Sequence, residues 1–272
     1  MKFLYRILKI LPMPVLQTLF DFVAIILYLL LKKRRIMAQD NIKKAIGGNY
    51  KKTALKTYLY FAKMVAENIK YIGNEKYIKK HAKIDGEEYY DYAKSLNRGV
   101  IAVLAHFGNW EMMACVASFL KEKVNIMVRP LDNKKLDEII EGARASCASR
   151  VISSRESAFR FIKLLKKNET LGILIDQAAN ENALKIDFFN RKARVNEGVA
   201  IFSYRLGTPV LPAYMKEDKG KYTLVFEKPI VCEHTGDFKK DVENMMIKIY
   251  SRFEDWIRHS PEKYLWMHNR WK

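Results

Sequence analysis

The stretch Gly99-Val-Ile-Ala-Val-Leu-Ala-His-Phe-Gly-Asn-Trp-Glu111 combines a short apolar run, a turn and the start of a helical pattern. Residues 99–104 are continuously apolar, which is typical of a strand buried on both faces. Gly108 tolerates φ values that other residues avoid, and Asn109 is a favourable helix N-cap. We therefore expect a strand over 99–104, a turn around Gly108 and a helix that begins near Trp110.

Two side chains in this stretch have the chemistry that acyl transfer to an alcohol needs. A neutral imidazole can take the hydroxyl proton near pH 7, and a carboxylate can fix the tautomer of that imidazole. On one continuous helix, residues five apart are rotated by about 140° and do not share a face. The turn at Gly108 removes this obstacle, so we predict His106 on a loop as the general base and Glu111 as its partner. The alternative is that His106 caps backbone groups and Glu111 complements a helix dipole.

Apolar runs and amphipathic segments alternate along the rest of the chain. This alternation predicts an α/β fold, a mainly parallel sheet flanked by helices. In such sheets ligands bind beyond the carboxyl ends of the strands. His106, Arg129 and Asp176 each follow a predicted strand, so we expect them to converge on one crevice. Strands are expected at 99–104, 124–128, 151–152, 170–175, 209–214 and 222–226, and helices at 51–73, 110–121, 134–148, 156–167, 196–206 and 238–259.

The N-terminal segment 11–31 is almost continuously apolar and is followed by four cations at 32–35. Its length suffices to span a bilayer as a helix, but Gln17 and Asp21 disfavour the bilayer centre. A spanning helix, a helix in the membrane interface and a soluble core helix remain open. A signal peptide is disfavoured, since cations rather than small residues follow.

The chain of 272 residues carries a formal net charge of +19, which favours an anionic partner. Four cations beside an apolar segment suit an anionic cytoplasmic lipid surface better than nucleic acid. We expect two parts, a membrane anchor with its basic flank at 1–35 and a catalytic domain at 36–272.

Chemistry that depends on other groups finds little support in the sequence. Its three cysteines have neither CxxC nor zinc-type spacing, and we expect buried apolar thiols in a reducing cytosol. Neither a serine nucleophile elbow, a metal-binding motif nor a nucleotide-binding glycine loop occurs. We therefore expect no cofactor and no metal, but direct attack of a substrate hydroxyl on an acyl thioester.

The motifs of the chain and their order resemble those of the late acyltransferases of lipid A biosynthesis, the lauroyl/myristoyl type. These enzymes belong to the lysophospholipid acyltransferase superfamily. The resemblance extends over essentially the whole chain. It is carried by the apolar N-terminal segment, Ala105–Glu111, Arg129-Pro130 with Asp132-Asn133, Leu136-Asp137 and Arg144, Asp176-Gln177, Asp187–Arg191, Gly198–Ala200, Gly207–Pro212 and Pro261–Lys272.

The resemblance implies a membrane-associated O-acyltransferase of lipid A, and hence lipopolysaccharide, biosynthesis at the cytoplasmic face of the inner membrane. It implies His106 and Glu111 as the catalytic pair, an acyl-carrier-protein or acyl-CoA donor, and a hydroxyl of a lipid A precursor as acceptor. Substrate-binding candidates are Arg129, Asn109, Asp176, Gln177, Arg191 and Arg194.

Each of these candidates also has a structural interpretation. Arg129 suits a phosphate or the thioester carbonyl, or an ion pair with Asp132 or Asp176. Asp176 and Gln177 suit either positioning of the His106 loop and acceptor or ordinary hydrogen bonding. Arg191 and Arg194 suit donor-protein carboxylates, lipid phosphates or a solvated loop.

Two alternative functions remain. One is the same chemistry on a lysophospholipid or a glycosylated phosphoinositide, although a downstream glycine-arginine element of the F-P-E-G-T-R kind is missing from the sequence. The other is a non-catalytic basic protein that binds membrane or nucleic acid.

Overall fold

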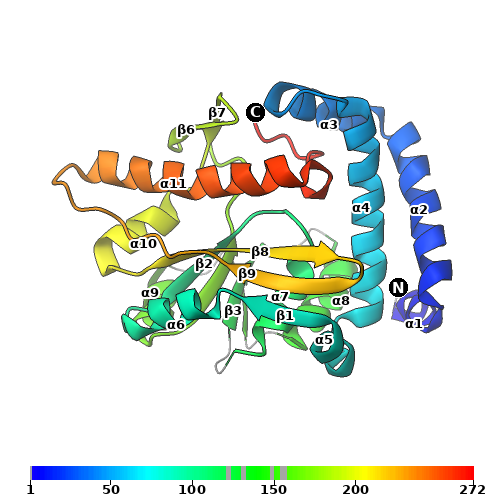
Figure 1. Cartoon of the computed structure of the whole chain (residues 1–272), viewed down its shortest axis with the longest axis horizontal. Coiled ribbons are helices and arrows are strands. Elements are labelled where there is room, and N and C mark those ends of the chain that lie inside the picture. The colour runs from blue at the N-terminus through cyan, green and yellow to red at the C-terminus, as the bar shows by residue number, and fades with distance from the viewer. Residues whose placement is uncertain (1, 121–123, 130–132, 148–149, 154–157) are drawn as a thin grey trace.

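The computed structural model describes residues 2–272 except 121–123, 130–132, 148–149 and 154–157, and a sheet lies at its centre (Figure 1). The strands are β1 Ala82–Asp85, β2 Val100–Leu104, β3 Val124–Val128, β4 Arg150–Ser153, β5 Thr170–Leu174, β6 Lys185–Phe188, β7 Arg191–Arg194, β8 Val210–Asp218 and β9 Lys221–Phe226. Seven of them form one sheet in the order β1-β9-β8-β2-β5-β3-β4, whereas β6 and β7 form a separate hairpin. Only β8 and β9 pair antiparallel among the seven described strands of that sheet. The predicted α/β fold with a mainly parallel sheet is therefore confirmed.

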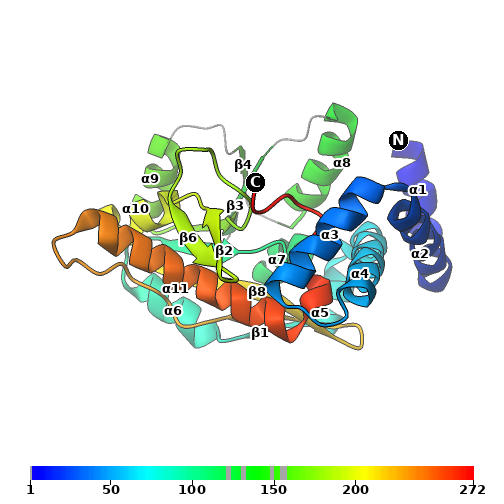
Figure 2. The same cartoon turned by 90° about the horizontal axis from the view of Figure 1, so that it is seen from above.

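Helices cover both faces of this sheet (Figures 1 and 2). They are α1 Lys2–Ile10, α2 Met13–Leu30, α3 Lys32–Ala45, α4 Tyr50–Tyr71, α5 Glu75–His81, α6 Glu87–Ser95, α7 Trp110–Ala117, α8 Lys134–Ala145, α9 Ala158–Lys166, α10 Gly198–Leu206 and α11 Phe238–His259, with a 3-10 turn at Pro261–Lys263. Strand β2 shows why both faces are covered. Ile101 and Val103 belong to the same apolar cluster as Phe253 of α11, whereas Val100 belongs to a second cluster with Met112 of α7. The continuous apolar run of β2 is thus buried from both sides.

The N-terminal helices are docked on the rest of the molecule, with α2 lying alongside α4 (Figure 1). Leu16 and Ala24 of α2 are buried, whereas Phe22 is 62% exposed and Leu29 is 61% exposed. Lys70 at the end of α4 donates through Nζ to the Leu11 carbonyl at 2.7 Å. Among the described residues, α2 is the helix that is long and apolar enough to cross a membrane. Its apolar surface nevertheless divides into a face that packs on α4 and a face that is left open.

The segment after β2 turns sharply, as its sequence predicts. Gly108 has φ +68°, and a Cβ there would lie 2.4 Å from the Met215 carbonyl oxygen, so no other residue fits. Asn109 caps α7, because its side chain accepts a hydrogen bond from the Met112 N–H at 3.3 Å. His106 therefore lies on the loop and Glu111 in the first turn of α7.

Several elements were not expected from the sequence. Strand β1, the hairpin β6–β7 and helices α3, α5 and α6 are short or rich in charge, so their apolar periodicity is weak. The strand expected at 209–214 continues to Asp218, because it pairs with β9 up to Lys221. Tertiary pairing thus extends elements that local patterns leave undefined.

Candidate active site

His106 lies beside Asp176 at the carboxyl ends of two neighbouring parallel strands. Strands β2 and β5 pair in register, with Leu104 opposite Leu174. The residues two positions beyond these leucines are His106 and Asp176, and His106 Nδ1 lies 2.7 Å from Asp176 Oδ1. The Asp176 side chain is 3% exposed and that of His106 is 17% exposed. The carboxylate is thus buried behind the ring, which stays accessible from the other side.

The two groups favour each other's charged form. Burial alone would lower the pKa of His106, but the charge of Asp176 and the hydrogen bond to it outweigh burial and raise this pKa above 6.5. Burial likewise would raise the pKa of Asp176, but His106 outweighs it and the pKa of the carboxyl is lowered. Arg270 also lowers this pKa through its positive charge. Asp176 therefore stays ionised, accepts a hydrogen bond from Nδ1–H and leaves Nε2 as the basic nitrogen.

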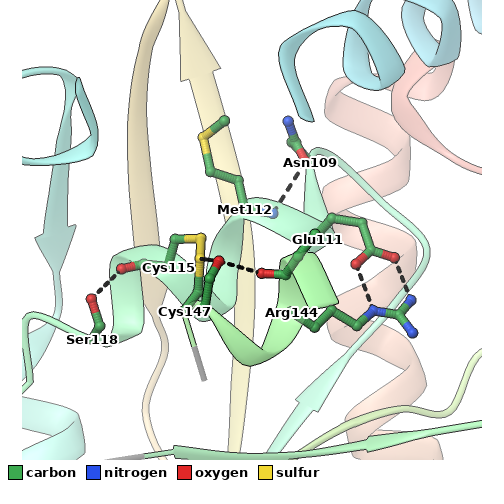
Figure 3. Close-up of a disulfide and its surroundings, with 9 residues drawn as sticks. Asn109, Glu111, Met112, Cys115, Ser118, Arg144 and Cys147 are labelled. Carbon is green, nitrogen blue, oxygen red and sulfur yellow. Dashed lines mark hydrogen bonds and ion pairs between the residues drawn. A yellow bond between two sulfur atoms is a disulfide. The ribbon is translucent and has the colours of Figure 1, made fainter. Parts of the chain in front are cut away.

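Glu111 has a different partner from the one that the sequence predicts. Its carboxylate accepts two hydrogen bonds from Arg144 of α8, from Nε at 2.8 Å and from Nη2 at 2.5 Å. Figure 3 shows this two-point ion pair between α7 and α8. The Trp110 indole N–H also donates to Glu111 Oε1 at 3.2 Å, and the Trp110 ring contacts the His106 ring edge-on at 5.0 Å. The place beside His106 Nδ1 that we expected Glu111 to occupy thus belongs to Asp176.

Backbone hydrogen bonds join the C-terminal segment to the His106 loop. Leu265 N–H donates to the His106 carbonyl at 3.0 Å, and Gly108 N–H donates to the Lys263 carbonyl at 3.0 Å. Phe107 and Tyr264 form an antiparallel bridge between these two bonds. The loop therefore has backbone support on both sides of Phe107.

Two apolar cavities lie near this site. The first, the α2–α4 cavity of about 500 Å³, reaches from α2 to the C-terminal segment at Leu265, Met267 and His268. The second, the α1–α8 cavity of about 360 Å³, lies between α1, α4 and α8 and has Glu111 in its wall. Val65 of α4 lines both cavities. Apolar space on this scale beside polar side chains suits the hydrocarbon part of a lipid.

Comparison with known proteins gives this arrangement a family. The pattern that defines the bacterial lipid A biosynthesis acyltransferases matches residues 2–272. The chain belongs to this family. It is therefore an acyltransferase that acts on lipid substrates, and the resemblance stated from the sequence is confirmed.

Individual relatives of this acyltransferase are distant. Lipid A biosynthesis palmitoleoyltransferase of Escherichia coli (strain K12) is 23% identical over 278 residues, which cover 96% of this chain and 86% of the relative. Lipid A biosynthesis acyltransferase of Shigella flexneri matches with the same figures. A solved structure, the 1-acyl-sn-glycerophosphate (LPA) acyltransferase PlsC from Thermotoga maritima, is similar at a TM-score of 0.42 and 12% identity, over 89% of this chain and 95% of that one.

Two further candidate residues of this acyltransferase differ in their position, because Gln177 lies beside His106 and Asn109 does not. Gln177 Nε2 is 3.4 Å from His106 Nε2, on the open side of the ring. Asn109 is buried, and its Nδ2 donates to Glu67 Oε2 at 3.4 Å besides capping α7. Gln177 thus lies beside the His106 ring, whereas the contacts of Asn109 are those of a helix cap.

The three arginine candidates lie in two places. Arg129 is exposed immediately after β3, and the residues Pro130 and Asp132 of the resemblance lie outside the described part of the chain. Arg191 of β7 stacks on the Trp271 ring at 4.3 Å. Arg194 Nη2 donates to the Lys272 carbonyl. The β6–β7 arginines therefore hold the C-terminal segment.

The sequence did not predict two arginines that interact with the site residues Glu111 and Asp176. Arg144 pairs with Glu111 although 33 positions separate them in sequence. Arg270 is 2% exposed, and its charge acts on Asp176. Neither pairing follows from local spacing, although both arginines are among the residues of the family resemblance.

The expectation of three free buried thiols was wrong for two cysteines. Cys115 and Cys147 form a disulfide with a Cα–Cα distance of 4.4 Å, whereas Cys232 is free and buried. A separation of 32 residues in sequence gave no sign of this pairing. The fold brings the two residues together because α7 and α8 pack beside each other (Figure 3).

Proposed function

We propose that this acyltransferase moves a fatty acyl chain from an acyl thioester to a hydroxyl of a lipid A precursor, with His106 as the general base. The observation that carries the proposal is the hydrogen bond from His106 to the buried Asp176, which leaves Nε2 on the open side of the ring. The site faces the cytoplasm at the inner membrane in this proposal, where an acyl-carrier-protein or acyl-CoA donor is present. No cofactor or metal takes part.

The reaction needs one proton transfer in each direction. The acceptor hydroxyl oxygen attacks the thioester carbonyl carbon while His106 Nε2 takes the hydroxyl proton. The tetrahedral intermediate then collapses, the C–S bond breaks, and the imidazolium returns the proton to the leaving thiolate. Asp176 stabilises the imidazolium through the Nδ1 hydrogen bond, which is consistent with the raised pKa of His106.

Glu111 serves this reaction through Arg144 in our proposal. Glu111 binds Nε and Nη2 of Arg144, which leaves the Nη1 side of the guanidinium for another acceptor. Trp110 lies between the pair and the base, because it donates to Glu111 Oε1 and contacts the His106 ring edge-on. A fixed guanidinium beside the base suits the developing oxyanion of the intermediate. Arg129, which is exposed beyond β3, is a less suitable candidate for this role.

The lipid character of both substrates is supported by the surroundings of the site. The α2–α4 and α1–α8 cavities are apolar and lie beside helices that expose apolar side chains such as Phe22 and Leu29. The net charge of +19 suits anionic lipid and an acidic donor protein. We assign the exposed face of α1 and α2 to one leaflet of the membrane.

Lipid mass spectrometry of a strain that lacks this gene tests the proposal. We expect a lipid A species lighter by one acyl chain, restored by the wild-type protein and not by His106→Ala. An unchanged lipid A together with altered glycerophospholipids would instead assign the enzyme to lysophospholipid acylation. Membrane-bound His106→Ala protein with near-wild-type transfer would exclude His106 as the base.

A further inference from the structure

Helices α7 and α8 are joined at two neighbouring points. The first is the ion pair of Glu111 with Arg144, and the second is the disulfide of Cys115 with Cys147. Cys115 follows Glu111 by four residues, which is about one turn of α7, so both side chains leave the same face of the helix. Figure 3 shows the disulfide and the ion pair side by side between the two helices.

The disulfide is linked directly to the backbone of Arg144. Cys147 N–H donates to the Arg144 carbonyl at 3.0 Å in the turn that follows α8. On the other side, Ser118 Oγ donates to the Cys115 carbonyl at 2.6 Å and closes the end of α7. The covalent bond therefore holds both helix ends, and with them the two residues of the ion pair.

Trp110 connects the Glu111–Arg144 ion pair to His106. Trp110 Nε1 donates to Glu111 Oε1, and the Trp110 ring contacts His106 edge-on. A shift of Arg144 away from Glu111 changes the charge and the hydrogen bonding beside the His106 ring. A displacement of this kind is sufficient to change a catalytic rate.

A cleft gives small molecules access to the two cysteines. It has a volume of about 340 Å³, and its walls include Asn74, Ser118 and Ser146 together with Cys115 and Cys147. Cys115 is 4% exposed, whereas Cys147 is half-buried, so an external thiolate reaches the Cys147 sulfur more readily. A disulfide that a thiol can approach through a cleft is open to thiol–disulfide exchange.

We propose that the Cys115–Cys147 disulfide is a redox-sensitive clamp that holds Arg144 against Glu111 and thereby controls the rate of acyl transfer at His106. This regulation rests on the proposed function of His106. Cys115 and Cys147 act as positioning residues, and Arg144 is the group that they position. In a reducing cytosol the clamp is open, and oxidising conditions close it and raise the rate.

The exchange is a two-electron reaction with a dithiol. A thiolate of the dithiol attacks the Cys147 sulfur, and the S–S bond to Cys115 breaks with Cys115 leaving as a thiolate that takes a proton. The second thiol of the dithiol then displaces Cys147, which also takes a proton. The protein gains two thiols and the dithiol becomes a cyclic disulfide, and oxidation by another disulfide reverses each step.

The test compares oxidised and reduced forms of the full-length protein in detergent. Mass spectrometry after alkylation first establishes the state of Cys115 and Cys147. Transfer from lauroyl-CoA to a lipid A precursor is then measured before and after dithiothreitol. We expect kcat to fall about tenfold on reduction with little change in KM, a size typical of coupling between distant groups. Cys232→Ser should respond like the wild type, because Cys232 lies in a separate buried position.

Two variants separate a clamp from a merely structural disulfide. Cys115→Ser with Cys147→Ser should show the low rate in both conditions. Arg144→Ala should remove the difference between oxidised and reduced protein, because the clamp acts through this residue. Equal kcat values in the two verified redox states would overturn the clamp. The same holds if the ratio of kcat between oxidised and reduced protein is unchanged in Arg144→Ala, or if Cys115 and Cys147 remain free thiols after mild oxidation.

A readout without acyl transfer keeps the two proposals apart. The NMR signals of the His106 ring should differ between oxidised and reduced protein, and identical signals would overturn the clamp. Absence of transfer in both redox states, with His106 signals that do differ, would contradict the proposed function, and rate control with it, while supporting a link between the disulfide and His106.

Discussion

His106 Nδ1 lies 2.7 Å from Asp176 Oδ1, although 70 residues separate the two in sequence. The contact follows from the register of β2 and β5, which places Leu104 opposite Leu174. Each side chain comes two residues after its leucine, so both leave the same edge of the sheet. The imidazole and its carboxylate are thus positioned by strand pairing and not by a common helix.

Asp176→Asn should reduce kcat strongly with little effect on folding. The amide is close to the carboxylate in size, but it does not stabilise the imidazolium or enforce the Nδ1–H tautomer. We expect a loss on the order of 10²- to 10⁴-fold, the usual contribution of a general base. Glu111→Gln provides the comparison, because Glu111 contacts Arg144 instead of His106. A smaller loss in Asp176→Asn than in Glu111→Gln would argue against Asp176 as the orienting carboxylate.

The rate of acyl transfer should rise with pH through the pKa of His106. The base acts only when neutral, and Asp176 raises this pKa above 6.5, so activity should be lost below a midpoint that lies above 6.5. Removing the negative charge in Asp176→Asn should move this midpoint to lower pH. A profile of kcat/KM against pH for both proteins measures the shift, and a midpoint that moves upward would contradict it.

Gly108→Ala should destabilise the protein by more than Gly220→Ala. Both glycines have positive φ, +68° at Gly108 and +75° at Gly220, so both substitutions carry a backbone cost of about 1–3 kcal/mol. The added Cβ meets the Met215 carbonyl oxygen at 2.4 Å only at Gly108, whereas no heavy atom lies within 4 Å at Gly220. Thermal unfolding in detergent measures the difference, and equal melting temperatures would contradict the crowding at Gly108.

Phe22→Glu combined with Leu29→Glu should weaken binding to anionic vesicles. These side chains are exposed on α2, and insertion of apolar side chains of this size contributes about 1.5–3 kcal/mol each. Phe159→Glu is the control, since Phe159 is 82% exposed but lies on α9, away from the N-terminal helices. Flotation with vesicles checks the result, and an equal loss of binding in the control would contradict a specific membrane face.

Local features of the sequence predicted the elements around the base correctly. The apolar run before Ala105, the glycine at Gly108 and the cap at Asn109 each act through their immediate neighbours, and the structure confirms β2, the turn and α7. The family also followed from the order of motifs along the chain.

Pairings between distant segments were beyond local analysis. The sequence indicated strands before His106, Arg129 and Asp176, but not that β5 lies between β2 and β3. That order makes Asp176 the neighbour of His106. The partner of Glu111 and the bond of Cys115 to Cys147 depend in the same way on how α8 packs against α7.

The backbone bonds from the C-terminal segment to the His106 loop have a consequence for the order of events during synthesis. Leu265 and Lys263 hold the residues around Phe107, and they follow His106, Arg144 and Asp176 along the chain. Chains fold from the N-terminal side as they are made. The helices that expose apolar surface can therefore meet the membrane while the His106 loop of the nascent protein still lacks its C-terminal support. In the proposed function, the enzyme would thus reach its lipid environment before it becomes active.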